Sequence, residues 1–307
     1  MFEAFSVGPA IIWTRVVFLL LGIWLATEFF LRLAESAHLS LQHFRENSLR
    51  YAVALFACGR FFALIAQYRV YLRDPIRIFI VWDGNFSFVG AAVGIAAVLY
   101  WATKEHRTTF LQWLDVLLPA TIFGLAFDWF GMFASGQAYG KPTDVFFGVT
   151  YDAMSVRYTV PIHPVQLYYA FFYLFLTFLL LVIRKQSTRA GSETACGIIL
   201  ASIATFFFEY FRGDFTIPVF ATRMDFAVLI LLFVSLGIFA AVENRFSQRA
   251  MIIYEVLLLL TFFVYLIARA WLQYPTFELR FSQFLAVLAS LGTVVYVIVH
   301  RRRYPHL

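Results

Sequence analysis

The chain has 307 residues, of which 62% are hydrophobic, 20% aromatic and only 14% charged, with a formal net charge of +6. A soluble globular chain is typically about 45–50% apolar and about 25% charged, so the composition excludes that class. It predicts an all-α integral membrane protein, a polytopic helical bundle. Because the chain lacks a Gly-rich phosphate loop, a zinc-protease motif and a hydrolase nucleophile elbow, we expect no metal and no cofactor. No pairing of basic and aromatic residues suggests nucleic acid.

Apolar windows of roughly the 20 residues that a membrane-spanning helix needs recur along the chain. The predicted spans are residues 10–33, 49–68, 85–102, 111–127, 164–183, 194–212, 224–241, 250–272 and 281–299. The first is too long for the apolar core of a signal peptide and lacks a basic segment before it, so we expect a permanent span. Seven spans are predicted to form one membrane domain, residues 1–245. The last two spans and a basic tail form an appendage, residues 246–307.

The distribution of lysine and arginine predicts the orientation of the chain. Connections that follow odd-numbered spans carry more of these residues than connections on the other side. The positive-inside rule therefore places the N-terminus outside and the C-terminus in the cytoplasm. The run Arg301–Arg303 is expected to rest on anionic headgroups. Cys58 and Cys196 fall inside predicted spans without metal-type spacing, so we expect small apolar packing residues.

Two connections are long. Residues 69–85 hold an apolar stretch too short to span, interrupted by Pro75 and Gly84, which indicates an interfacial or re-entrant segment. Residues 129–162 hold several glycines and prolines and are predicted to be a non-helical loop on the outer side. Loops of this length commonly build functional sites.

Ionisable residues inside apolar spans are functional candidates, because each costs several kcal/mol unless it is paired. Arg60 lies in the middle of the second span, and Glu209 and Arg212 lie near the end of the sixth. Glu209 and Arg212 are three residues apart, so an internal ion pair remains an alternative to a functional site. A guanidinium gives two parallel hydrogen bonds to a phosphate, so Arg60 and Arg212 are candidate ligands of a phospholipid headgroup.

The segment Ile162–Ala170, IHPVQLYYA, places polar side chains at the entrance of the fifth span. Pro164 suits the first turn of a helix. Taken alone, His163 fits a capping or interfacial role better than a catalytic one, and Tyr168 and Tyr169 would equally suit an aromatic belt at the membrane surface.

Taken together and in order, these pieces resemble the motifs of the prolipoprotein diacylglyceryl transferase family. The similarity covers roughly residues 8–242. The matching pieces are Gly59–Arg60, Asp74–Pro75, Val81–Trp82 with Gly84, Ser87–Phe88 with Gly90, Gly136 and Gly140, His163–Pro164 with Gln166, Leu167 and Tyr168, and Glu209 with Arg212, Gly213 and Asp214. The resemblance implies a multi-pass enzyme of the bacterial plasma membrane. Such an enzyme moves a diacylglyceryl group from phosphatidylglycerol to the cysteine thiol of a lipoprotein precursor.

The resemblance also implies site residues. His163 and Glu209 are the alternative bases for the thiol, and the sequence leaves the choice open. The implied substrate-binding residues are Arg60, Arg212, Gln166, Tyr168, Ser87 and Asp214.

Several positions depart from the family pattern. Trp129 stands where the family has arginine, Tyr169 where it has glutamate, and Val89 where it has histidine. The other departures are Ala91, Met132, Ser135, Gln137, Ala201 and Thr205. Arg15 falls on a family tyrosine and is a candidate replacement for a lost arginine. The departures keep open a second interpretation, a catalytically inactive homologue that binds phospholipid or lipoproteins. A transporter is disfavoured because the chain has no internal repeat.

Overall fold

The computed structural model describes residues 4–7, 10–76, 86–104, 107–151, 156–187, 189–214, 219–221 and 279–303, with isolated positions between 234 and 267. The chain divides into two compact units. The first comprises residues 1–197 and 211–218, and the second comprises residues 198–210 and 219–307. Most of the predicted spans 224–241 and 250–272 lie outside the described residues, as does the predicted boundary after residue 245.

Helices dominate the described residues. They are α1 (Thr14–Ser36), α2 (Gln42–Glu46), α3 (Ser48–Ala66), α4 (Tyr68–Arg73), α5 (Phe88–Ala102), α6 (Arg107–Ser135), α7 (Val165–Gln186), α8 (Ser192–Phe211) and α11 (Phe281–Arg303). Among the residues described, six of these helices are long and apolar enough to cross a membrane, and α5 is a shorter apolar helix. The predicted all-α polytopic membrane fold is therefore confirmed.

The first span begins later than predicted. Residues 10–13 form strand β2 (Ala10–Trp13), which pairs antiparallel with β1 (Ala4–Val7) so that Ala4 faces Trp13. The β-branched pair Ile11–Ile12 favours extended backbone, and α1 starts only at Thr14. The prediction that the span starts at residue 10 was wrong, because an apolar strand and an apolar helix have the same hydropathy.

Helix α6 ends later than predicted. It continues through Pro119 to Ser135 instead of stopping at residue 127. Gly136 follows with a positive φ of 70°, the left-handed conformation that commonly ends a helix at glycine. Asp128 and Trp129 therefore lie inside α6, and the predicted non-helical loop loses its first turns.

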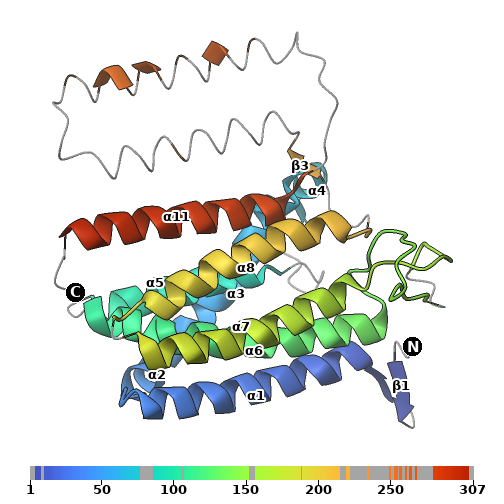
Figure 1. Ribbon diagram of the computed structural model, residues 1–307, viewed down its shortest axis with the longest axis horizontal. Coiled ribbons are helices and arrows are strands. Elements are labelled where there is room, and N and C mark those ends of the chain that lie inside the picture. Colours follow the sequence, from blue (N-terminus) through green and yellow to red (C-terminus); the bar gives the residue numbers. More distant parts are fainter. Residues whose placement is uncertain are drawn as a thin grey trace. The chain divides into compact units, whose positions relative to one another are not determined.

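Small residues bring α1 and α6 close together in the first unit, where the two helices run side by side (Figure 1). A Cβ built on Gly22 would lie 2.7 Å from the Gly124 carbonyl oxygen, and one built on Gly131 would lie 2.8 Å from Phe18 Cβ. Real Cβ atoms do not approach neighbours so closely, so the crossing requires glycine. Such contacts let membrane helices approach at backbone distance.

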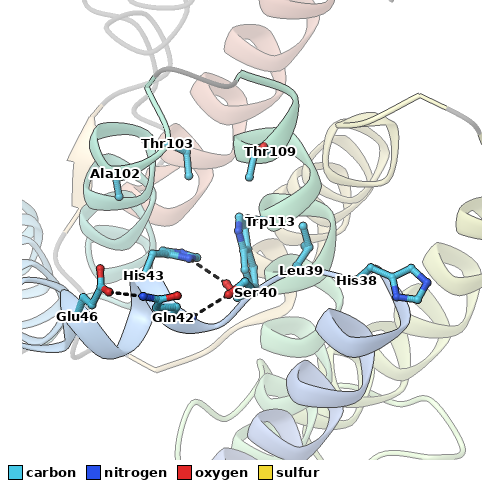
Figure 2. Close-up of a pocket in the computed structure, with 10 residues that line it drawn as sticks. All are labelled: His38, Leu39, Ser40, Gln42, His43, Glu46, Ala102, Thr103, Thr109 and Trp113. Atoms are coloured by element: carbon cyan, nitrogen blue, oxygen red, sulfur yellow. Dashed lines mark hydrogen bonds between the residues drawn. The ribbon is translucent and has the colours of Figure 1, made fainter.

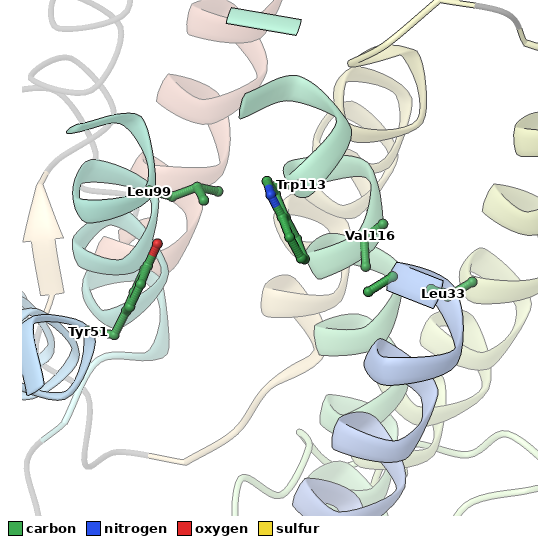
Figure 3. Packing of buried hydrophobic residues seen from close by; sticks show 6 residues of the cluster. Leu33, Tyr51, Leu99, Trp113 and Val116 are labelled. Atoms are coloured by element: carbon green, nitrogen blue, oxygen red, sulfur yellow. The ribbon is translucent and has the colours of Figure 1, made fainter. Parts of the chain in front are cut away.

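An apolar cluster joins four helices at the other end of α1. Figure 3 shows Leu33, Tyr51, Leu99, Trp113 and Val116, which come from α1, α3, α5 and α6. Trp113 is only 1% exposed, and aromatic rings from α1 and α2 lie against it. A buried indole contributes a large apolar area, so this cluster stabilises the end of the first unit that lies away from the loop 136–164.

The second unit holds residues 198–210 of α8 together with α11. Strand β3 (Val219–Ala221) pairs with β4 (Leu279–Arg280), which leads directly into α11. The buried amide of Gln283 donates a 3.0 Å hydrogen bond to the Phe206 carbonyl and thereby joins α11 to α8.

Candidate functional site

The loop after α6 joins the start of α7 to the end of α8 within the first unit. Lys141 N–H donates to the Phe211 carbonyl at 2.8 Å, and His163 N–H donates to the Lys141 carbonyl at 3.0 Å. Gly213 N–H donates to the Tyr139 carbonyl at 2.8 Å. The segment Tyr139–Lys141 therefore holds the backbone of His163 on one side and that of the residues around Arg212 on the other.

The loop also contacts the start of α1 through Arg15. Arg15 Nε donates to Asp128 Oδ1 at 3.3 Å, and Arg15 Nη1 donates to Gln137 Oε1 at 2.6 Å. The Asp128 side chain is only 3% exposed, whereas that of Arg15 is 33% exposed. A buried carboxylate requires a cation or several hydrogen bonds, and here a partly exposed guanidinium provides the charge.

Gln166 extends this network into α7. Its side chain is fully buried, and its Nε2 donates to the Gln137 carbonyl at 2.7 Å. The Tyr151 hydroxyl donates to the Phe133 carbonyl at 3.2 Å. Burial raises the pKa of Tyr151, while its hydrogen bond with Gln166 acts in the opposite direction, so this phenol stays protonated. We call Arg15, Asp128, Gln137 and Gln166 the Arg15 cluster.

An aromatic pair lies beside Asp128. The rings of Trp129 on α6 and Tyr169 on α7 stack with centroids 4.0 Å apart and planes 9° from parallel. Tyr169 is 1% exposed. The family resemblance implied an arginine at position 129 and a glutamate at position 169. Both partners of this contact therefore differ from the family pattern together.

His163 precedes α7 and pairs with a neighbouring hydroxyl. Its Nδ1 lies 3.0 Å from the Tyr168 hydroxyl, and its ring centroid lies 5.0 Å from that of Phe211. Burial lowers the pKa of His163. The imidazole is therefore neutral at pH 7 and able to accept a proton.

Arg212 and Asp214 form a two-point ion pair. Arg212 Nε lies 3.1 Å from Asp214 Oδ1, and Nη2 lies 2.6 Å from Oδ2. Both side chains are buried. This fork is the strong geometry for a guanidinium and a carboxylate, and it anchors Arg212 at the end of α8.

The other predicted site residues have contacts elsewhere. Glu209, in the second unit, has its Oε2 3.5 Å from Arg280 Nη1. The guanidinium carbon of Arg60 lies 5.5 Å from the ring centroid of Tyr71. Ser87 Oγ accepts a hydrogen bond from Gly90 N–H at 3.3 Å and caps α5. The structure therefore brings Gln166, His163, Tyr168, Arg212 and Asp214 to one loop. The catalytic and substrate-binding roles of all these residues stay predictions.

Sequence reasoning treated Arg15 only as a candidate replacement for a lost arginine and Gln137 only as a departure from the family pattern, and it left Asp128 and Tyr151 outside the predicted site. One signal was present: two opposite charges in two apolar spans, each without an oppositely charged neighbour in sequence. Such residues are expected to form an ion pair between helices.

In the part of the chain that the structure describes, no group of three or more histidines, cysteines or acids is arranged to hold a metal ion.

A separate cavity lies at the other end of α1. Its volume is about 470 Å³, and Figure 2 shows His43, Gln42 and Glu46 on one wall. Gln42 Nε2 donates to Glu46 Oε1 at 2.7 Å, and His43 Nδ1 lies 3.3 Å from the Ser40 carbonyl. None of the predicted site residues lines this cavity.

The fold and the site define a class: a multi-pass helical membrane protein whose polar groups gather at the loop between α6 and α7. A family model described as prolipoprotein diacylglyceryl transferase matches residues 3–243. The chain belongs to this family, and the predicted extent of the resemblance, roughly residues 8–242, agrees with the match.

Individual relatives carry the name phosphatidylglycerol–prolipoprotein diacylglyceryl transferase. The protein of Vibrio vulnificus strain YJ016 is 30% identical over 218 residues, which cover 68% of this chain and 77% of that protein. The protein of Pseudoalteromonas atlantica is 27% identical over 198 residues, 61% of this chain and 70% of that protein. The protein of Polynucleobacter necessarius is 40% identical over 98 residues, so the match spans about a third of that relative, 36%.

Proposed function

We propose that the chain is a phospholipid-dependent transferase that moves the diacylglyceryl group of phosphatidylglycerol to a cysteine thiol of a lipoprotein precursor. Membership of the family and the names of the relatives support this function. One observation of the structure carries it: the segment Tyr139–Lys141 holds the backbone of His163 and that of Arg212 on its two sides. A proton acceptor and a cation are thus attached to one loop.

The reaction needs both groups. The thiol sulfur attacks a glycerol carbon, a carbon–sulfur bond forms, and the bond from that carbon to the phosphate oxygen breaks. The thiol proton goes to a base, and glycerol phosphate leaves with the bonding electrons. A neutral His163 suits the proton transfer, and the Arg212 guanidinium suits the developing charge on phosphate. Glu209 remains the alternative base, with Arg280 as its ion-pair partner.

The test is a transfer assay with purified full-length protein in phosphatidylglycerol vesicles. The acceptor is a synthetic peptide with one cysteine, and mass spectrometry detects the thioether product. We expect product with the natural chain, and a loss of at least about 100-fold with His163→Gln, within the range of general-base catalysis. The Glu209→Gln variant distinguishes the two bases, because only the true base is essential.

A natural chain that makes no thioether product would contradict the transferase function. If that chain still bound phosphatidylglycerol, the inactive homologue would be the correct description. Complementation of a bacterium depleted of its own diacylglyceryl transferase provides an independent readout, because the cell supplies natural precursors.

We also propose a bacterial plasma membrane location, with the N-terminus outside, the C-terminus in the cytoplasm and residues 246–307 as an appendage to the family domain. Phe146, in the loop 136–164, is 97% exposed. In a chain with Cys58 and Cys196 changed to alanine, Phe146→Cys should react with an impermeant maleimide in intact cells. Labelling only after lysis would show that the chain has the opposite orientation.

A further inference from the structure

We propose that Arg15 binds the phosphate of the phospholipid donor, and that Asp128 and Gln137 position its guanidinium for this purpose. The inference rests on the proposed function for the identity of the lipid. It adds a residue that lies on α1, away from the predicted site residues along the chain.

The guanidinium of Arg15 is held on one side and open on the other. Nε and Nη1 donate to Asp128 and Gln137, while Nη2 has no hydrogen-bond partner within the described ranges of the chain. The side chain is 33% exposed. A guanidinium presents five N–H donors in a planar fork that suits a phosphate. The open edge therefore provides donors for a ligand without breaking the contacts that hold the group.

The guanidinium groups of Arg15 and Arg212 are held in different ways. Arg212 grips Asp214 with two nitrogens, at 3.1 and 2.6 Å. Arg15 touches Asp128 with Nε alone, at 3.3 Å, and gives its shorter hydrogen bond, 2.6 Å, to the neutral amide of Gln137. Asp128 therefore receives charge compensation, but the amide fixes the direction of the guanidinium.

The surroundings of Arg15 fit a phospholipid. Arg15 is the second residue of α1, next to Trp13, which is 55% exposed. Tryptophan at a helix start is typical of the headgroup level. Around the helix from Arg15, an apolar strip faces outward, with Val16 43%, Leu20 61% and Ile23 55% exposed. A lipid with its phosphate on Arg15 would lay its acyl chains along this strip.

The first experiment measures transfer kinetics for phosphatidylglycerol with full-length variants. Arg15→Ala should raise KM about tenfold or more, the usual scale for the loss of a charged hydrogen bond. The KM of Arg15→Lys should lie between that of the natural chain and that of Arg15→Ala, because an ammonium keeps the charge but lacks the planar fork of donors. The matched control is Arg32→Gln on the same helix, whose exposed arginine pairs with Glu28; it should leave KM unchanged.

The double variant Arg15→Gln with Asp128→Asn separates ligand binding from charge compensation. It removes both charges, so no buried carboxylate is left without a cation and folding is protected. If Arg15 binds phosphate, the raised KM persists in the double variant. A normal KM in this variant, or in Arg15→Ala, would overturn the proposal and leave Arg15 as the counter-ion of Asp128.

A binding measurement keeps this test separate from the proposed function. Native mass spectrometry of the purified chain with short-chain phosphatidylglycerol needs no turnover. Weaker binding to Arg15→Ala than to Arg32→Gln supports the proposal even if the natural chain transfers nothing. Equal binding to the two variants contradicts it. Competition by inorganic phosphate alone would show that the group recognises a free phosphate rather than the lipid.

Discussion

The Trp129 and Tyr169 rings stack 4.0 Å apart and nearly parallel, at 9°, and join α6 to α7 one residue after Asp128. The family resemblance placed opposite charges at these positions, and the stack is an uncharged way to hold the same two helices together. Offset aromatic pairs contribute about 0.5–1.5 kcal/mol beyond their buried area. The pair therefore supports the geometry of the Arg15 cluster without belonging to the chemistry.

Removing one ring of this stack should destabilise the protein. We expect Trp129→Ala to lower the free energy of unfolding, by less than the about 3–5 kcal/mol that a fully buried aromatic residue costs, because Trp129 is only partly buried. Thermal unfolding in detergent measures the change. Trp24→Ala is the matched control, since Trp24 is 65% exposed on α1 and should shift Tm little. Similar shifts for both variants would show that the stack does not join the helices.

The glycine crossing between α1 and α6 gives a second prediction. Gly131→Ala places a methyl group 2.8 Å from Phe18 Cβ and 3.3 Å from Arg15 Cα, so α1 must move away. We expect a loss of about 1–3 kcal/mol from overpacking, together with weaker phosphatidylglycerol binding because Arg15 shifts. Gly292→Ala on α11 is the control, because its Cβ meets nothing within 4 Å. If Gly131→Ala binds phosphatidylglycerol as tightly as the natural chain does, this helix crossing does not position the Arg15 cluster.

Asp115 should be a structural acid. Its carboxylate on α6 accepts hydrogen bonds from Gly191 N–H at 2.6 Å, Thr194 N–H at 2.9 Å and the Thr194 hydroxyl at 2.6 Å, and thereby caps the start of α8. Asp115→Ala leaves these donors without their partner and should cost about 1–3 kcal/mol. Tm reports the loss, and the exposed Asp144→Ala serves as the comparison. An equal Tm for the two variants would contradict the capping role.

The lowered pKa of His163 predicts a pH dependence of transfer. The neutral imidazole is the base, so kcat/KM should rise with pH through a midpoint below 6.5 and then stay level towards neutrality. The same burial makes the charged form unfavourable in the folded state. Stability should therefore be unaffected above pH 6.5 and should fall as the pH drops below it.

The measurement is a pH–rate profile over about pH 5 to 8, the range in which histidine titrates. Tyr168→Phe should keep the acidic limb with a shifted midpoint, because the hydroxyl on Nδ1 is lost. A profile of His163→Gln with the same limb as the natural chain would assign the titration to another group.

Hydropathy predicted most of the fold, because six of the described helices coincide with predicted spans to within a few residues at most ends. It failed where polarity was misleading. Asp128 resembled the polar end of a span, yet it lies inside α6 because Arg15, 113 residues away, compensates its charge. The ion-pair partners were harder still to predict from the sequence. The i, i+3 spacing suggested Glu209 with Arg212, and the structure adds Arg280 as a partner of Glu209 and Asp214 as a partner of Arg212. Spacing along the sequence does not determine such contacts between residues that are distant in the chain.

The separation of Arg15 from Asp128 also sets an order for biogenesis. α1 leaves the ribosome first, and its arginine meets this acidic partner only after 113 further residues have been made. At about 5–20 residues per second, the delay is roughly 6 to 23 seconds. The position of Arg15 in the first turn of α1 lets the side chain wait among the headgroups during that time. An arginine two turns deeper would have to remain in the apolar layer without its partner during that time, so the place of this charge suits the insertion of the chain as well as its finished fold.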